Sequence, residues 1–222
     1  MSADHDAEES VRHDLVRAAR KLVEDGLTRG TSGNVSARTQ GSTDFWVTAS
    51  GCGLGTAARE DLVRVSFDGS VEEGSRPPSS EWRIHRDVYC SRPEIQAIVH
   101  VHPPFATTVA CLRRSLPPVH YEIAFAGGHD VRCAAYATFG TEELSQAALA
   151  ALTCRNACLL ANHGMIALGA TLEAATHLAG VVETVAEIYW RALAVGEPVL
   201  IERDEMDRVV AKLSSYGPNA KR

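Results

Sequence analysis

Apolar residues recur at helical spacing, or follow helix-start signals, in six stretches of the chain. The first runs from Val11 to Val23, with Ser10 as a candidate N-cap and Gly26 placed to end the helix. A long alanine-rich stretch near the end of the chain stops at Gly196. Helices are therefore expected over residues 11–25, 81–90, 105–112, 141–152, 171–195 and 204–213.

Short apolar runs bounded by turn residues predict strands between these helices. One run ends in Asp68-Gly69, a hairpin signal. Strands are expected after the polar turn in residues 31–38 and at about 45–48, 62–67, 97–102 and 157–162, with two to four more between Pro117 and Thr138. Because strict strand-helix-strand alternation is missing, the pattern favours an α/β fold in which helices pack on a mixed or largely antiparallel sheet.

Composition narrows the class of protein. The 222 residues are 45% hydrophobic and 23% charged, which suits one globular domain, with residues 1–9 flexible and a mobile tail at about 214–222. The net charge of −6 argues against a nucleic-acid groove. No apolar run is long enough to cross a membrane, and the acidic start does not resemble a secretion signal, so we expect a cytoplasmic protein. We interpret the six cysteines as free, mostly buried thiols.

The most informative polar positions are histidines at strand ends. His100 and His102 are one residue apart, so in a strand both imidazoles project from the same face. His163 ends a second apolar run and enters a glycine turn. Three neutral imidazoles with an open fourth position are typical of a catalytic zinc site, although another divalent metal is possible. Each histidine alone would more often be a hydrogen-bonded core residue.

A second group of polar residues suits an anion. Ser79 and Ser80 precede a predicted helix, whose free N–H groups and dipole attract a phosphate, although an ordinary N-cap is the simpler interpretation. Glu81 follows them and could transfer protons beside a metal. Two small turns, Gly33-Asn34 and Ser50-Gly51, would let the backbone approach an anion closely. Tyr121 and Tyr216 are candidate phenolic acids or simply half-buried aromatics.

Five motifs in order along the chain resemble the class II aldolase and adducin family. They lie at residues 31–38, 78–85, 98–102, 136–141 and 162–164, and the resemblance extends from about Val11 to Gly217. It implies one domain over residues 1–222, folded as a three-layer α/β/α sandwich with a mixed, largely antiparallel central sheet. It also implies a homotetramer with active sites at subunit interfaces.

The resemblance also implies a role for each candidate residue. His100, His102 and His163 would bind Zn²⁺, and Glu81 would be the catalytic acid and base. Tyr121 would help to protonate an aldehyde oxygen, while Phe139 and Tyr216 would close the site from the side. The phosphate would be bound by Gly33, Asn34, Ser50, Gly51, Ser79 and Ser80.

The implied function is cleavage of a ketose 1-phosphate, with L-fuculose 1-phosphate as the leading candidate, to dihydroxyacetone phosphate and an aldehyde. A Schiff-base lysine is not required, and the three lysines lie in predicted surface segments. Alternatives are dehydration of a methylthioribulose phosphate, decarboxylation, pentulose-phosphate epimerisation, or an adducin-like scaffold without catalysis. Epimerisation is disfavoured because Ala49 stands where the epimerases carry a lysine, and Glu81 where they tend to carry aspartate.

Overall fold

A seven-stranded sheet lies at the centre of the computed structural model, which describes residues 2–72 and 75–214. The strand order is β3-β2-β1-β4-β7-β6-β5, and among these strands only β5 and β6 pair in parallel. The mixed, largely antiparallel sheet expected from the sequence is thereby confirmed. The strands are β1 (Asn34–Ala37), β2 (Asp44–Thr48), β3 (Leu62–Ser66), β4 (Ala97–Val101), β5 (Arg132–Ala134), β6 (Ala157–Leu160) and β7 (Gly164–Gly169).

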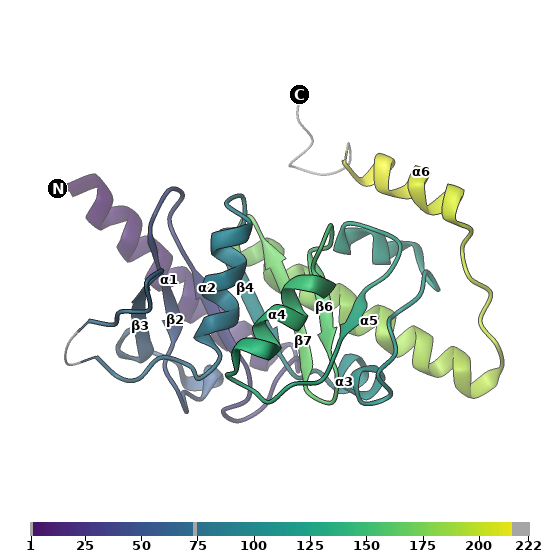
Figure 1. Cartoon of the computed structure of the whole chain (residues 1–222), viewed down its shortest axis with the longest axis horizontal. Helices are drawn as coiled ribbons and strands as arrows, with labels where there is room; N and C mark the ends of the chain where they lie inside the picture. The colour runs from purple at the N-terminus through teal and green to yellow at the C-terminus, as the bar shows by residue number, and fades with distance from the viewer. Residues whose placement is uncertain (1, 73–74, 215–222) are drawn as a thin grey trace.

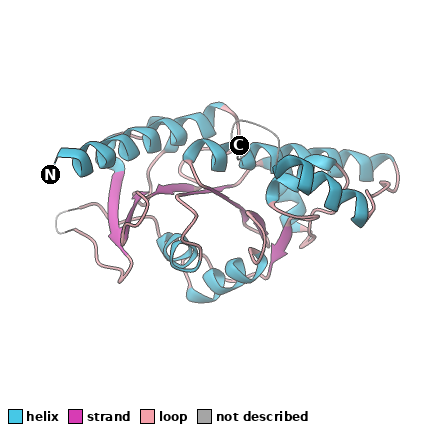
Figure 2. Ribbon diagram, turned by 90° about the horizontal axis from the view of Figure 1, so that it is seen from above, coloured by secondary structure: helices cyan, strands magenta, loops and turns pink. Residues whose placement is uncertain are grey.

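Helices cover both faces of this sheet, which gives the three-layer α/β/α sandwich (Figures 1 and 2). The longest helices pack on one face, while two shorter helices, α2 and α4, pack on the other. The helices are α1 (Ser2–Glu24), α2 (Trp82–Ser91), α3 (Pro104–Cys111), α4 (Glu142–Ala151), α5 (Leu172–Val195) and α6 (Arg203–Ser214). Three short 3-10 helices are η1 (Leu54–Thr56), η2 (Arg59–Asp61) and η3 (Tyr121–Ala126).

Strand β4 is apolar on both faces because both are covered by helices. Val99 belongs to the core beneath α1 and α5, and Ile98 to the core beneath α2 and α4. Because side chains alternate along a strand, His100 shares the face of Ile98. The first candidate metal ligand therefore points toward the α2 and α4 layer.

The first helix is longer than the sequence pattern predicts. It begins at Ser2, so the expected N-cap at Ser10 is wrong. Residues 2–9 lack the apolar spacing that identifies the rest of the helix. Glu8 instead contacts the sheet edge: it accepts a hydrogen bond from Trp46 Nε1 at 3.1 Å and pairs with Arg64 at 3.1 Å. Glu8 is therefore held against β2 and β3 rather than free.

Two further expectations about elements are wrong. Between Pro117 and Thr138 the described chain forms one strand, β5, plus the 3-10 helix η3, instead of two to four strands. The strand β7 was not expected. It is a second short apolar run, which follows directly on the turn at His163. The helix starts were better predicted: Thr141 and Thr171 cap α4 and α5 through their side chains.

Two bulk expectations can also be compared with the structure. None of the helices in the described part of the chain is long and apolar enough to cross a membrane. All six cysteines are free, but only Cys52 and Cys158 are buried. The expectation of mostly buried thiols is therefore wrong, since Cys90, Cys111 and Cys154 are exposed.

Candidate active site

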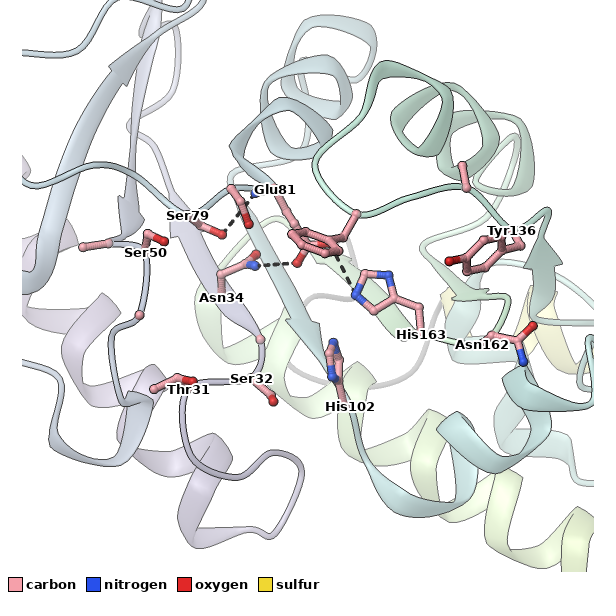
Figure 3. A pocket seen from close by; sticks show the side chains of 16 residues that line it. Thr31, Ser32, Asn34, Ser50, Ser79, Glu81, His102, Tyr136, Asn162 and His163 are labelled. Atoms are coloured by element: carbon pink, nitrogen blue, oxygen red, sulfur yellow. Dashed lines mark hydrogen bonds and ion pairs between the residues drawn. The ribbon is translucent and has the colours of Figure 1, made fainter.

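A pocket of about 340 Å³ lies at the end of β4, and residues from both halves of the chain line it (Figure 3). Its N-terminal wall consists of three loops, and its C-terminal wall comes from the segments that follow β5 and β6. The lining residues are Thr31, Ser32, Gly33, Asn34, Ala49, Ser50, Gly51, Ser79, Ser80, Glu81, His102, Tyr136, Ala137, Phe139, Asn162 and His163.

The structure brings the three candidate ligand histidines together. His100 lies in β4, His102 follows that strand directly, and His163 occupies the turn between β6 and β7. The ring centroids are 4.8 to 4.9 Å apart in all three pairs. One potential ligand atom from each lies within 4.8 Å of the others. The imidazoles from two distant stretches of sequence thus surround one point.

Hydrogen bonding orients the most buried of these rings. His100 Nδ1 lies 2.9 Å from the carbonyl oxygen of Met165 on β7. Since a carbonyl only accepts, Nδ1 carries the hydrogen and the lone pair of His100 is on Nε2. That Nε2 lies 3.0 Å from His102 Nε2. Two nitrogens bound to one tetrahedral zinc are about 3.3 Å apart, so the arrangement fits a divalent metal with an open fourth position.

Glu81 lies beside the histidines at the N-cap of α2, with a side chain that is almost fully buried. Its Oε2 is 3.1 Å from His100 Nε2 and accepts a hydrogen bond of 3.1 Å from Asn34 Nδ2. Its Oε1 is buried, 3.4 Å from His163 Nε2, and has no hydrogen-bond partner in the described structure. One carboxylate oxygen is therefore fixed, and the other is left for a ligand.

The electrostatics of the cluster favour metal-binding forms of these side chains. Burial alone would raise the pKa of Glu81, but His100, His163 and Asn34 together hold it well below its usual range. Burial, reinforced by the charge of His100, lowers the pKa of His102 to about 3 and that of His163 to about 4. Both rings are therefore neutral at neutral pH, as metal ligands must be.

His100 behaves differently from the other two. Burial lowers its pKa, but Glu81 and the Met165 carbonyl more than offset this effect, and the pKa lies above the ordinary value. The carboxylate of Glu81 therefore favours a positive charge at His100 Nε2, 3.1 Å away. The cluster is suited to hold a divalent metal ion at this point.

The three loops expected to bind an anion line one side of the pocket. Ser79 and Ser80 lie just before α2, Ser50-Gly51 follows β2, and Gly33 precedes β1. Backbone hydrogen bonds tie two of these loops together, from Ser50 N to Pro77 O at 2.9 Å and from Ser79 N to Thr48 O at 3.1 Å. The arrangement offers hydroxyl and backbone N–H donors near the start of a helix, which suits a phosphate.

Gly33 has a specific structural reason to be glycine. Its φ of +86° lies in the left-handed region, and a Cβ there would be 2.6 Å from the carbonyl oxygen of His100. This close approach brings the loop that carries Asn34 against the strand that carries the histidines. Asn34 itself is buried and uses its amide toward Glu81, so one amide hydrogen at most remains for a phosphate.

The opposite side of the pocket is formed by Tyr136, Phe139 and Asn162, and Figure 3 shows Tyr136 and Asn162 across from Ser50 and Ser79. Arg113 holds this wall, because its Nε donates to Asn162 Oδ1 at 2.8 Å and its guanidinium lies over the Tyr136 ring at 5.8 Å. Sequence reasoning did not identify Tyr136 and Asn162 as lining residues, nor Thr31 and Ser32. The one signal in the sequence for Asn162 was its position next to His163.

One expected site residue, Tyr121, does not line this pocket, and another lies outside the described residues. Tyr121 lies in η3, is 48% exposed, and packs its ring on His120 at 4.7 Å instead of lining the cavity. Tyr216 lies outside the described residues. Within the described residues, the candidate metal ligands, base and anion loops therefore lie in one place, without Tyr121.

Comparison with known proteins agrees with this geometry. Residues 13–190 match the family model described as class II aldolase and adducin N-terminal domain. The chain is 49% identical over 211 residues to the 5-methylthioribulose-1-phosphate/5-deoxyribulose-1-phosphate aldolase of Rhodospirillum rubrum, covering 95% of this chain and 94% of that protein. It is 45% identical over 193 residues to the L-fuculose phosphate aldolase of Escherichia coli K12, covering 86% and 88%. A solved L-fuculose 1-phosphate aldolase structure superimposes with a TM-score of 0.89 at 42% identity, covering 96% and 98%.

Proposed function

Because the chain belongs to the class II aldolase and adducin family, and its named relatives are aldolases, we propose that it cleaves a ketose 1-phosphate reversibly to dihydroxyacetone phosphate and an aldehyde. The observation that carries the proposal is the convergence of three imidazoles and Glu81 beside the Ser79-Ser80 helix start. A scaffold without catalysis would have no need to place a buried carboxylate beside three potential metal ligands.

The pocket chemistry supports a substrate with one phosphate and an uncharged aldehyde half. None of the described residues that line the pocket is lysine or arginine. The phosphate would be held by serine hydroxyls, backbone N–H groups and the helix start. The opposite wall, with Tyr136 and Phe139, offers aromatic surface and no second anion site. A bisphosphate is therefore a poor fit.

Two substrate groups have support, and we place the 5-deoxypentulose 1-phosphates first. The Rhodospirillum rubrum relative, named for 5-methylthioribulose 1-phosphate and 5-deoxyribulose 1-phosphate, is 49% identical and covers nearly all of the chain. L-Fuculose 1-phosphate is the second candidate, supported by the 0.89 TM-score of the fuculose enzyme. Both groups share the phosphate half and give a small, uncharged aldehyde.

The residues divide the chemistry between them. When bound by His100, His102 and His163, a divalent ion such as Zn²⁺ supplies Lewis-acid stabilisation for negative charge on the dihydroxyacetone phosphate half. Glu81 gives a proton to C3 after the C3–C4 bond breaks, and removes that proton in the reverse direction. A tyrosine or water takes up the proton from the C4 oxygen. The net result is transfer of one proton from oxygen to carbon, so the reaction is balanced.

A coupled assay for dihydroxyacetone phosphate tests this proposal. Protein purified without chelator is incubated with 5-deoxyribulose 1-phosphate, 5-methylthioribulose 1-phosphate, L-fuculose 1-phosphate and a ketose 1,6-bisphosphate. We expect dihydroxyacetone phosphate from the monophosphates and little from the bisphosphate. A product that retains all the carbon atoms of the substrate would instead indicate a dehydratase or epimerase.

We also propose that the active enzyme is a homotetramer in which Tyr121 of the partner subunit completes each site. Tyr121 is half exposed and does not line the pocket of its own chain, which supports this arrangement. Co-expression of Glu81→Gln and Tyr121→Phe chains should then give hybrids that are more active than either parent. In such hybrids an intact Glu81 and an intact Tyr121 meet across an interface. Hybrid activity equal to the average of the parents would argue against shared sites.

A further inference from the structure

A chain of buried polar side chains leads from the core beneath α2 to the carboxylate of Glu81. Tyr89 Oη lies 2.7 Å from Ser36 Oγ, which lies 2.6 Å from His85 Nδ1. His85 Nε2 lies 2.5 Å from Asn34 Oδ1, and Asn34 Nδ2 lies 3.1 Å from Glu81 Oε2. None of these side chains except Glu81 has a part in the proposed chemistry of the metal.

Local geometry explains why these four residues meet. Asn34 and Ser36 are two apart on β1, so their side chains share one face of the sheet. His85 and Tyr89 are four apart on α2, so they share one face of the helix. Packing of α2 on that face of β1 therefore places the pairs opposite each other. All four side chains are at most 3% exposed, so no solvent competes for these hydrogen bonds.

The donors and acceptors in this series of hydrogen bonds can be satisfied in one direction. A carboxylate only accepts, so Asn34 must present its NH₂ group to Glu81 and its Oδ1 to His85. His85 must then donate from Nε2, which leaves Nδ1 as an acceptor for the Ser36 hydroxyl. Ser36 in turn accepts from the Tyr89 hydroxyl. Every hydrogen points from the core toward the active site.

A neutral His85 is consistent with this assignment. Burial lowers its pKa to about 3, so the ring carries a single proton at neutral pH. A neutral imidazole has one donor and one acceptor nitrogen, which matches its two partners. With the opposite tautomer, Nε2 and Asn34 Oδ1 would both be acceptors at 2.5 Å. The amide of Asn34 would then have to turn and direct its oxygen at the carboxylate of Glu81.

We propose that His85 is a positioning residue for proton transfer: it fixes the Asn34 amide, which holds Oε2 of Glu81 and leaves Oε1 as the oxygen that exchanges the proton with substrate. The lack of a hydrogen-bond partner for the buried Oε1 in the described structure supports this division. The inference rests on the proposed function, because the proton exchanged is the one at C3 of dihydroxyacetone phosphate.

Two amide variants at position 85 separate positioning from packing. Glutamine can place an N–H where His85 Nε2 lies, whereas asparagine reaches only the position of Nδ1. His85→Gln should therefore keep the donor to Asn34, and His85→Asn should lose it. Both replace a buried imidazole by a buried amide, so they form a matched pair. Metal content and the urea unfolding midpoint are measured for each variant, to check that both variants fold and bind metal equally.

The readout is exchange of the C3 hydrogen of dihydroxyacetone phosphate with D₂O, followed by NMR in the metal-loaded enzyme. We expect His85→Asn to slow exchange and cleavage by roughly 10- to 100-fold, with metal content and KM within about twofold of the wild type. In His85→Gln, the rates of exchange and cleavage should stay within about threefold of the wild type. Equal activity of the two variants, whether high or low, would overturn the positioning role.

A second measurement does not depend on catalysis or on the variants folding. In ¹⁵N-histidine-labelled, metal-loaded wild-type protein, His85 should show the neutral tautomer protonated at Nε2. Protonation at Nδ1 would overturn the proposal even if the enzyme is an active aldolase. Conversely, a wild type that shows the Nε2 tautomer but no C3 exchange with any metal would overturn the proposed function and, with it, the catalytic use of this network.

Discussion

The two carboxylate oxygens of Glu81 have different surroundings, and this difference defines its chemistry. Oε2 accepts a hydrogen bond from Asn34 and faces His100, while Oε1 has no hydrogen-bond donor in the described structure. A buried carboxylate oxygen without a donor costs free energy of folding unless a ligand approaches it. The residue is therefore arranged for contact with something that the chain itself does not supply.

Glu81→Gln should bind metal and lose most turnover. The amide oxygen can still accept from Asn34, so the three imidazoles keep their positions, but glutamine cannot take or give a proton. We expect cleavage to fall by about 10²- to 10⁴-fold with metal stoichiometry unchanged. Steady-state assays with metal analysis measure both quantities. Full activity of this variant would remove Glu81 from the mechanism.

Gly164 is required by the metal cluster for steric reasons. A Cβ at this position would lie 2.5 Å from His102 Cδ2 and 2.6 Å from the carbonyl oxygen of Val101. Gly164→Ala should therefore displace His102 and weaken metal binding by roughly 10- to 100-fold in a chelator competition assay. Gly180→Ala in α5 is the control, because nothing lies within 4 Å of its Cβ. The control should keep wild-type affinity, and the same affinity in Gly164→Ala would contradict this account.

The sequence predicted the histidine cluster better than the pocket walls. His100 and His102 were identifiable because a spacing of two has a fixed meaning in a strand. Tyr136 and Asn162 were not, because their places depend on how the segments after β5 and β6 turn, and no periodic pattern records that. The φ of +54° at Asn162, unusual for a residue other than glycine, is likewise invisible in the sequence.

At the scale of elements, the pairing of β1 with β4 positions Asn34, which donates to Glu81, relative to the candidate metal ligands. Asn34 lies directly opposite His100 in this antiparallel pair. Because alternate residues face opposite sides, a shift of one position would turn Asn34 toward the other helix layer. In the observed register, Gly33 lies close against the carbonyl oxygen of His100.

Helix α3 begins immediately after His102, and its start depends on a residue of another helix. Glu183 of α5 accepts from the backbone N–H groups of Phe105 at 2.9 Å and Ala106 at 2.8 Å. These are N–H groups of the first turn, which have no acceptor within a helix. Burial raises the pKa of Glu183, against the effect of these two hydrogen bonds. The carboxylate therefore fixes the segment that follows the histidine cluster.

Glu183→Gln should lower the free energy of unfolding by about 1–3 kcal/mol, because one of the two N–H groups would face an amide NH₂ group. Urea unfolding measures this change. Glu187→Gln, one turn further along α5, is the matched control. Glu187 makes a partly exposed ion pair with Arg191, so its loss should cost at most about 1 kcal/mol. Equal effects of the two substitutions would show that the cap contributes nothing specific.

The accuracy of the predicted elements followed the strength of their patterns. Helices α4 and α5 combine apolar spacing with a threonine cap, and both starts were predicted. The first eight residues of α1 carry charges instead of an apolar face, and Glu8 among them contacts β2 and β3, which no sequence pattern records. Residues 117–138 contain short apolar groups that can form strand or 3-10 helix, and tertiary packing decides between them.

For the whole molecule, metal binding should couple stability to the cation. His100 lies in β4, His102 follows that strand, and His163 lies between β6 and β7, so one ion would cross-link two parts of the sheet. At a free metal concentration about 100 times Kd, the gain is roughly 2.7 kcal/mol. Removal of metal by a chelator should lower the calorimetric midpoint by about 5–10 °C. His163→Gln should abolish most of that difference, and an unchanged wild-type midpoint would argue against a metal site.

The two walls of the pocket come from separate parts of the chain: residues 31–34, 49–51 and 79–81 line one wall, and residues 136, 137, 139 and 162 line the other. In the proposed reaction, substitutions in the second wall can therefore change the preference for the aldehyde without altering the residues that bind the phosphorylated fragment. Directed evolution restricted to those few later positions should broaden the range of acceptor aldehydes in synthesis while dihydroxyacetone phosphate stays the donor.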